Sequence, residues 1–423
     1  MGKLKVDDTQ RLPLWQPLWV RDFLLLYIGE SISLLGDQFY LVALPWLTIQ
    51  LTNSPLSLGT VLMAAAIPRA MFLLIGGVVS DRLPPRSIML LSNALRAVLT
   101  ALLTALVMFQ KPQLWHLYLF AISFGIIDGF FIPATKSIIP SLVTRELLAA
   151  SNALSMGTTQ LLVLIGPALG GLLIATTGIQ TAFAIDTASF LVTTSTLLLM
   201  KNSHQTSAAF DSSMRKPTFR RKIFSLIAGI YEGLNYVWNN RPLRVILLVI
   251  TILNLIFVGP LQVGIVSLAQ SRFPGGVIAL GIMNSAWGGG GLLGTLMPGV
   301  LRRFPKLGVL MLSLASIQGF GMFLLGYIPN IVWAGVTIAI LGFCSGFFTV
   351  LGITWIQKQT LPEMLGRVMS LGMLSSFGVA PFSYALAGTL AALNLTILFS
   401  VAGGIMLIMS LLLTANPSVR RID

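Results

Sequence analysis

Six ionisable residues lie inside stretches of the chain that are otherwise apolar for the length of a membrane-spanning helix. Four are acidic and two are arginines: Glu30, Asp37, Arg69, Arg96, Asp128 and Asp186. A charged side chain in the hydrocarbon core costs about 2.5–3.5 kcal/mol on insertion scales, so such residues are usually paired or functional. Four acids against two arginines leave two acids without a cation. A buried carboxyl group of that kind can take up and release a proton, as proton-coupled transport requires.

Depth along each helix, at about 1.5 Å per residue, predicts which of these residues meet. Asp37 and Arg69 lie about 15–18 Å from the outer ends of their spans, so we expect them to share a level and to pair. Glu30, Arg96 and Asp128 lie roughly 10–15 Å from the inner ends of theirs. The sequence therefore predicts a second, inner cluster of these three residues.

The acids are the candidate proton carriers, and the two arginines are their candidate charge partners. Glu30 and Asp37 are seven residues apart and share a helix face. We expect Asp37 to be the leading carrier, followed by Glu30 and Asp128, whereas Asp186, nearer the outer end of its span, favours a structural role. The alternative is that the charges form static ion pairs that lock helices together.

The composition excludes several classes of protein. Of 423 residues, 27 are Lys or Arg and 13 are Asp or Glu, so 9% are charged, against about 25% in soluble domains. The hydrophobic fraction is 55% and the mean hydropathy is +0.88. A soluble chain of this length cannot bury so much apolar surface. A disordered chain, a soluble enzyme and a nucleic-acid binder are all excluded.

The sequence also carries little that would bind a metal, a nucleotide or a disulfide partner. Cys344 is the single cysteine, and His116 and His204 lie far apart, which argues against disulfides and a histidine-rich metal site. No G-x-x-x-x-G-K-[ST] phosphate-binding pattern occurs. We therefore expect no metal and no cofactor, and the energy for any transport must come from a gradient.

Twelve apolar stretches are each about the length that a helix needs to cross a bilayer. They are too long and too continuous for barrel strands, and backbone groups in lipid must pair within the segment, so all twelve are predicted to be helices. The predicted spans are 23–47, 57–79, 88–109, 115–138, 152–176, 180–200, 243–268, 276–300, 308–328, 331–353, 368–391 and 395–414.

The basic residues predict the orientation, because short cytoplasmic loops are enriched in Lys and Arg. With the N-terminus inside, only Lys111 and Arg272 fall outside, and Arg69 and Arg96 fall within spans. The remaining 23 of the 27 basic residues are then cytoplasmic. We expect a multi-pass protein of the cytoplasmic (inner) membrane with both termini in the cytoplasm. The net charge of +14 reflects this topology.

The chain divides into two similar halves. Residues 1–200 are predicted to form an N-terminal six-helix bundle, 201–240 a cytoplasmic linker with an amphipathic helix (IFSLIAGIYEGLNYVWNN), and 241–423 a C-terminal six-helix bundle. Matches between the halves at one constant offset support a duplication. For example, Pro140 and Arg145 fall on Pro362 and Arg367. We expect these prolines to occupy equivalent places, and a substrate site between the halves.

The loop after the second span reads GGVVSDRLPPR (76–86). It resembles the signature loop of the major facilitator superfamily, although prolines replace the family's later glycine and a basic residue. The resemblance implies a gating loop, and we expect Asp81 to contact the start of span 11, near Arg367, when the cytoplasmic side is closed. The alternative is a charge cluster that only sets topology. The matching residues are Gly77, Asp81, Arg82 and Arg86.

The fifth span carries GPALGG (166–171), which resembles the antiporter motif of the same family, although Leu162 replaces an earlier glycine of that motif. Small residues four apart allow helices to approach closely. Gly166 and Gly170 form one such pair and Gly290 and Gly294 another, so two smooth faces are predicted to slide against each other. The alternative is ordinary tight packing. The matching residues are Gly166, Pro167, Gly170 and Gly171.

Other stretches, among them SLLGDQFYLVALP (33–45) and AIDTASFLV (184–192), resemble the branch that contains macrolide-efflux proteins and enterobactin exporters. The resemblance implies an all-α membrane protein of two six-helix bundles. It also implies a monomeric transporter, not an enzyme, that exports an amphipathic small molecule in exchange for protons by alternating access. A lysophospholipid flippase and a non-transporting membrane scaffold or sensor remain as alternatives.

Overall fold

A computed structural model describes residues 13–80, 82–201, 229, 231–300 and 307–414 of the chain. It contains twelve candidate membrane spans within these ranges. The elements are η1 (Gln16–Trp19), α1 (Arg21–Thr52), α2 (Pro55–Ser80), α3 (Pro85–Met108), α4 (Leu114–Leu142), η2 (Arg145–Leu147), α5 (Leu148–Thr177), α6 (Ile179–Leu199), α8 (Arg241–Ser271), α9 (Val277–Val300), α10 (Leu307–Leu325), α11 (Ile331–Gln359), α12 (Leu365–Phe377), α13 (Ala380–Leu393) and α14 (Leu395–Thr414).

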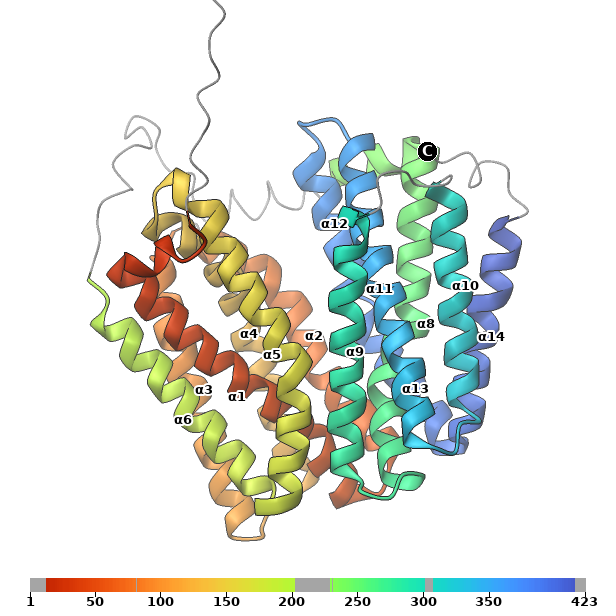
Figure 1. The fold of residues 1–423 in the computed structure, drawn as a ribbon, viewed down its shortest axis with the longest axis horizontal. Coiled ribbons are helices and arrows are strands. Elements are labelled where there is room, and N and C mark those ends of the chain that lie inside the picture. The colour runs from red at the N-terminus through yellow and green to blue at the C-terminus, as the bar shows by residue number, and fades with distance from the viewer. Residues whose placement is uncertain (1–12, 81, 202–228, 230, 301–306, 415–423) are drawn as a thin grey trace, which may run out of the picture.

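The helices form two bundles that stand side by side (Figure 1). Helices α1–α6 pack mainly on one another, as α2 does on α4 and α1 on α6, and helices α8–α14 do the same, as α9 does on α11 and α10 on α14. The described residues include no strand. The predicted fold class, an all-α membrane protein with twelve spanning helices, is confirmed.

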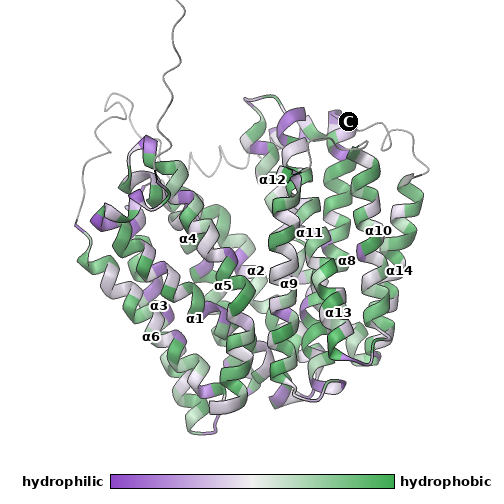
Figure 2. Cartoon of the chain, viewed as in Figure 1, coloured by the Kyte–Doolittle hydropathy of each residue, from purple (hydrophilic) through white to green (hydrophobic). Residues whose placement is uncertain are grey.

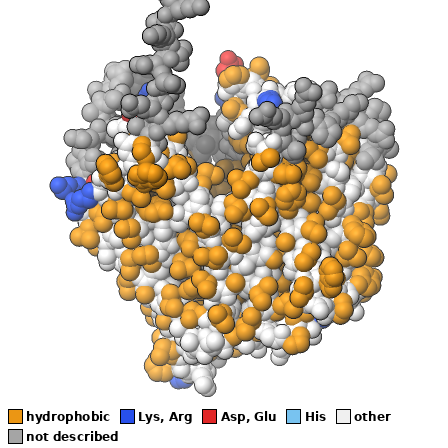
Figure 3. Space-filling view, in the orientation of Figure 1, with side chains coloured by type: hydrophobic (Ala, Val, Ile, Leu, Met, Phe, Trp, Pro, Cys, Tyr) orange, Lys and Arg blue, Asp and Glu red, His pale blue; other side chains and the backbone are white. Residues whose placement is uncertain are grey.

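Hydrophobic side chains cover the body of the molecule, and charged side chains lie at its two ends (Figure 3). Figure 2 shows the same pattern along the ribbons, with hydrophilic residues gathered at helix ends. This distribution suits a bilayer around the middle of the helices. We name the end at which α1 begins the terminal side, and the opposite end, at which α1 gives way to α2, the far side.

One predicted span is broken in the middle. The sequence predicts a single helix over 368–391, but this segment consists of α12 and α13, separated at Gly378 and Val379. Pro381 lies in the first turn of α13, where it has no N–H to continue the hydrogen-bond ladder of α12. Helix α12 forms one wall of a cavity described below.

The two halves repeat, but no single offset relates them. The start of α2 at Pro55 and the start of α9 at Val277 are 222 residues apart, the same spacing as between Pro140 and Pro362. The starts of α4 at Leu114 and α11 at Ile331 are only 217 residues apart. Pro140 consequently lies inside α4, and Pro362 lies in the turn beyond the end of α11. The expectation that the prolines occupy equivalent places is wrong, because loops of different length shift the alignment between the halves.

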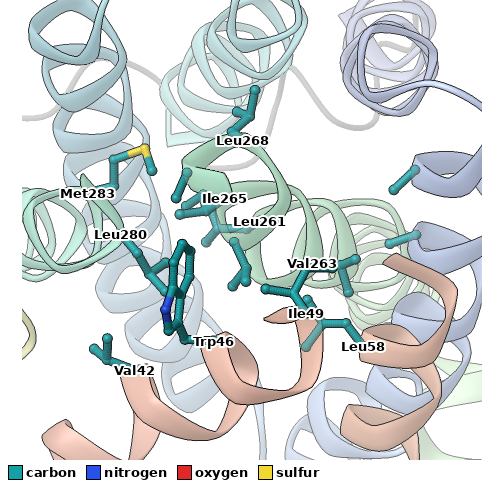
Figure 4. Packing of buried hydrophobic residues seen from close by; sticks show 14 of the residues in the cluster. Val42, Trp46, Ile49, Leu58, Leu261, Val263, Ile265, Leu268, Leu280 and Met283 are labelled. Carbon is teal, nitrogen blue, oxygen red and sulfur yellow. The ribbon is translucent and has the colours of Figure 1, made fainter. Parts of the chain in front are cut away.

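The bundles meet on the far side and diverge toward the terminal side (Figure 1). Apolar side chains from both halves form one buried cluster there, which we name the far-side seal. Trp46 of α1 packs near Leu280 of α9, and Ile49 lies near Val263 of α8 (Figure 4). At its edge, the Gln270 side-chain amide donates a hydrogen bond to Asn53 Oδ1 at 2.9 Å.

Glycines bring the backbones of the two bundles together within this contact. A Cβ atom at Gly281 of α9 would lie 3.1 Å from the Cα of Gly171 in α5, and one at Gly59 of α2 would lie 3.0 Å from the Cα of Gly388 in α13. Small residues of this kind allow helices in a membrane to approach closely. The closed far side therefore depends on residues without side chains.

We expect Gly281→Ala to weaken the contact between α5 and α9. The added methyl group meets the backbone of α5, and such overpacking costs about 1–3 kcal/mol. The thermal unfolding midpoint of the purified protein should therefore fall. Gly335→Ala in α11 is the matched control, because a Cβ there meets nothing within 4 Å, and its midpoint should not fall. Equal midpoints for the two variants would contradict this account of the seal.

Candidate functional site

A single carboxylate binds both arginines in the centre of the N-terminal bundle. Asp128 of α4 accepts from Arg69 of α2 through Oδ2 at 2.7 Å and from Arg96 of α3 through Oδ1. The Arg96 side chain is 5% exposed, that of Asp128 16% and that of Arg69 35%. Three helices are therefore tied together by one negative charge between two positive ones.

Aromatic rings hold the more deeply buried of these arginines. The guanidinium carbon of Arg96 lies 4.1 Å from the ring centroid of Phe131 and 5.6 Å from that of Phe190. Such cation–π contacts stabilise a cation that has lost its water, by about 2 kcal/mol in desolvated sites. Arg96 is thus kept charged without water, and Asp128 is its ion-pair partner.

The predicted pairing of the charges is wrong in part. The sequence predicts that Arg69 pairs with Asp37, but its ion pair is with Asp128. The expected contact between Arg96 and Asp128 is present, whereas Glu30 forms no ion pair with a described residue and its Oε1 atom has no hydrogen-bond partner. The charges do not separate into an outer and an inner cluster, because both arginines converge on one acid.

Three acids therefore have no cation bound to them among the described residues. Asp37 of α1 lies within electrostatic range of Arg96, Asp128 and Arg69, but forms neither an ion pair nor a hydrogen bond with a described side chain. Glu30, on the same helix, lies within range of Arg96 and Asp37. Neither of them forms an ion pair with a described residue, whereas Asp128 forms two.

Asp186 of α6 is the third acid without a bound cation among the described residues. Its surroundings differ from those expected of a purely structural residue. It is fully buried, and both of its carboxylate oxygens lack a hydrogen-bond partner within the described part of the chain. Gly36 of α1 makes room for it, since a Cβ there would lie 2.7 Å from Asp186 Oδ1. An unpaired buried charge is too costly to persist, so Asp186 joins Asp37 and Glu30 as a candidate proton carrier. The sequence indicates this only through the absence of Lys and Arg from the span 180–200 that contains Asp186.

The signature loop is only partly described. Asp81 lies outside the described residues, so its expected contact near Arg367 is not placed. A Cβ atom at Gly77 would meet nothing within 4 Å, whereas one at Gly76 would meet the backbone of Gly129. Arg86 donates from Nε to the Leu197 carbonyl at 2.8 Å. A cation at the C-terminal end of α6 is favourable there.

Arg367, at the start of α12, pairs with another acid. Its Nη1 lies 2.6 Å from Glu232 Oε2, in the helical segment 231–239 that precedes α8. Within that segment Gly233 and Val237 are buried, whereas Tyr231 and Trp238 are exposed. This pattern suits a helix at a membrane surface, with aromatic rings at the headgroup level.

The GPALGG residues face two different neighbours. Gly166 and Gly170 lie against Gln38 and Phe39 of α1, whereas Gly171 lies against Gly281 of α9. The expected sliding contact with Gly290 and Gly294 is wrong, because those glycines face the backbone of α11. The contact between bundles is made instead by Pro167 and Gly171 with Gly281. It is joined by a hydrogen bond from the Ala168 N–H to Ser285 Oγ at 2.9 Å.

Two bundles of spanning helices with a buried charge cluster define a membrane transport protein. A family model described as Major Facilitator Superfamily matches residues 26–383, and the chain belongs to that family. The enterobactin exporter EntS of Escherichia coli is 27% identical, covering 94% of this chain and 92% of its own length. The multidrug efflux pump Tap of Mycolicibacterium fortuitum is 26% identical, covering 92% of this chain and 94% of its own length. The macrolide efflux protein A of Streptococcus pyogenes is 22% identical, covering 96% of this chain and 98% of its own length.

Solved structures agree on the fold. The nucleoside transporter NupG superposes with a TM-score of 0.73 at 13% identity, covering 93% of this chain and 98% of that one. A peptide transporter of the POT type in complex with alafosfalin gives a TM-score of 0.73 at 14% identity, with 95% of each chain covered. The chain is therefore a transporter of this family with efflux pumps among its relatives.

We expect Asp128→Asn to destabilise the N-terminal bundle strongly. The change leaves Arg69 and Arg96 without their anion, and breaking a buried pair in this way costs about 3–5 kcal/mol. Arg69→Gln is the matched comparison, because it leaves the pair between Asp128 and Arg96 intact. Thermal unfolding of both variants measures the difference. If Arg69→Gln were as destabilising as Asp128→Asn, the two arginines would not depend on one shared carboxylate.

Proposed function

We propose that the protein exports an amphipathic small molecule across the cytoplasmic membrane, in exchange for protons, by alternating access of a single chain. The observation that carries the coupling is the excess of buried acids over cations. The N-terminal bundle holds four intramembrane acids and two arginines, and both arginines bind the same acid. The three remaining carboxyl groups would make the centre of the bundle strongly negative if all were ionised, so binding of protons offsets the cost.

The orientation rests on the basic residues. Most Lys and Arg of the chain lie in sequence segments that precede α1, follow α14 or connect helix ends of the terminal side, so we assign the terminal side to the cytoplasm. Because the bundles diverge on that side and meet at the far-side seal (Figure 1), the described conformation then corresponds to the inward-open state. Arg69 and Asp128 are partly exposed in it, so protons and substrate reach the cluster from the cytoplasm.

The names of the relatives support an outward direction and an amphipathic class of substrate. Proteins named for multidrug efflux, macrolide efflux and enterobactin export align over nearly the whole chain. These substrates are larger than a metabolite such as an amino acid and combine apolar and polar parts. We infer a substrate of the same general chemistry, and transport without chemical change.

Reconstituted protein distinguishes this proposal from its alternatives. Proteoliposomes are loaded with erythromycin, a macrolide, or with a fluorescent lysophospholipid, and an imposed pH gradient is switched on or off. An antiporter moves erythromycin faster when the gradient is present. A flippase moves the lysophospholipid regardless of the gradient, and a scaffold moves neither. Gradient-independent or absent macrolide transport would contradict the proposal for this substrate.

We expect Asp37→Asn to fold and to bind substrate, but to lose proton-driven accumulation. The amide keeps the shape of the side chain and cannot titrate. Asp22→Asn, at the start of the same helix, is the matched control and should transport as the wild type does. Uptake into inverted vesicles with an acidified lumen measures both. If Asp37→Asn kept full gradient-driven uptake, Glu30 or Asp186 would be the carrier instead.

A further inference from the structure

The C-terminal bundle contains a cavity of its own, separate from the charge cluster. Its volume is about 280 Å³, and it lies between α8, α11 and α12, reaching α10 and α14. None of the described residues that line it is charged. Apolar and weakly polar side chains make up most of the wall, among them Phe257, Phe348, Met369, Met373 and Met406.

The most deeply buried polar side chain of this cavity lacks a partner. Gln318 of α10 is 6% exposed, lines the cavity, and forms no hydrogen bond with any described residue. Its amide atoms are not fully enclosed by protein, so they border the open space of the cavity, where a hydrogen-bonding group can meet them. Asn254 of α8 lies in the same wall with its Nδ2 atom bonded to the Ile250 carbonyl at 2.9 Å. A ligand that offers hydrogen-bonding atoms would satisfy Gln318.

The cavity has an exposed edge, its mouth, on α11 and α12, and α12 contacts the other bundle. Thr349, Met373 and Phe377 line it and are exposed, and α12 stands at the edge of the C-terminal bundle nearest to α2, which it contacts (Figure 1). A molecule between the bundles on the terminal side can therefore reach the cavity. The break between α12 and α13 places Ser376 and Phe377 at this mouth.

We propose that this cavity binds the uncharged, apolar part of the exported molecule, with Gln318 as the hydrogen-bonding residue at its inner end; this inference rests on the proposed function. Methionine side chains adapt to different shapes, and aromatic rings add contact area. Such a wall suits apolar ligands that differ in shape. A ligand site of about 300–1,000 Å³ holds a drug-sized molecule. A cavity at the lower limit of that range takes one ring or side branch while the rest stays between the bundles.

The single cysteine of the chain makes the proposal testable by labelling. In a Cys344→Ser background, Ser376→Cys places a thiol at the mouth of the cavity. Ser370→Cys places one on the same helix at an exposed position outside the cavity. Both serines bond to a carbonyl of the preceding turn, so the two replacements are matched. The maleimide labelling rate of purified protein is measured with and without erythromycin, and separately with the neutral dye Nile red.

We expect either ligand to slow labelling of Ser376→Cys at least fivefold and to leave Ser370→Cys unchanged. Adding Gln318→Leu should raise the erythromycin concentration for half-protection about tenfold, the effect of losing one hydrogen bond to a buried group. The same change should not lower the thermal unfolding midpoint, since it removes a buried polar group without a partner.

Absence of protection at Ser376→Cys by both ligands would overturn the proposal, as would equal protection at Ser370→Cys. Unchanged half-protection in the Gln318→Leu variant would remove Gln318 from the site. The experiment uses no gradient and measures no transport. Failure of proton antiport in proteoliposomes would therefore leave the labelling result standing, and failure of protection alongside active transport would reject only the cavity.

Discussion

The ion pair of one carboxylate with two arginines is the constraint around which the N-terminal bundle is arranged. Asp128 is the one ion-pair partner that Arg69 and Arg96 have among the described residues. This fixes α2, α3 and α4 to one another at mid-membrane. Under the proposed antiport, the three acids without a bound cation among the described residues, Asp37, Glu30 and Asp186, are the candidate proton carriers.

The two halves of the molecule consequently differ in chemistry although they share a fold. The N-terminal half carries all six charges that lie deep within the spans, whereas the described helices α8–α14 carry charges only near their terminal-side ends, at Arg241, Arg244, Lys358 and Arg367. These helices surround an apolar cavity lined by the Gln318 amide. Under the proposed function, movement of the two halves couples proton exchange in one half to binding of an apolar group in the other. The far-side seal, built on Gly59, Gly171 and Gly281, is the contact that must open for this movement.

The fold and the charged residues could be predicted from the sequence, but the pairing of the charges could not. Depth is counted from predicted helix ends, and the observed ends differ. The predicted outer end of the first span is residue 47, whereas α1 continues to Thr52. Similarly, α4 continues to Leu142, beyond the predicted 138. These shifts do not decide the pairing, because Arg69, Arg96 and Asp128 already lie ten, eight and ten residues from the inner ends of the predicted spans. The pairing depends on which helix faces meet. Hydropathy alone cannot fix such ends, because loops next to the membrane are also apolar.

Other features depend on contacts that no local pattern contains. The cavity at Gln318 requires five helices to converge, and the pairing of Arg367 with Glu232 joins segments far apart in the chain. Glycine spacing predicts tight packing but not the partner, so the predicted neighbour of Gly166 is wrong. By contrast, the break at Gly378 is explained by Pro381, a residue that is visible in the sequence.

Proton movement driven by substrate tests the central claim most directly. Wild-type protein is reconstituted into proteoliposomes that contain a trapped pH indicator, and an erythromycin gradient is imposed with no initial pH difference. The account predicts that protons move against the direction of the drug, and that the pH change stops when the drug gradient is exhausted. Drug movement without any pH change would contradict the coupling of export to protons.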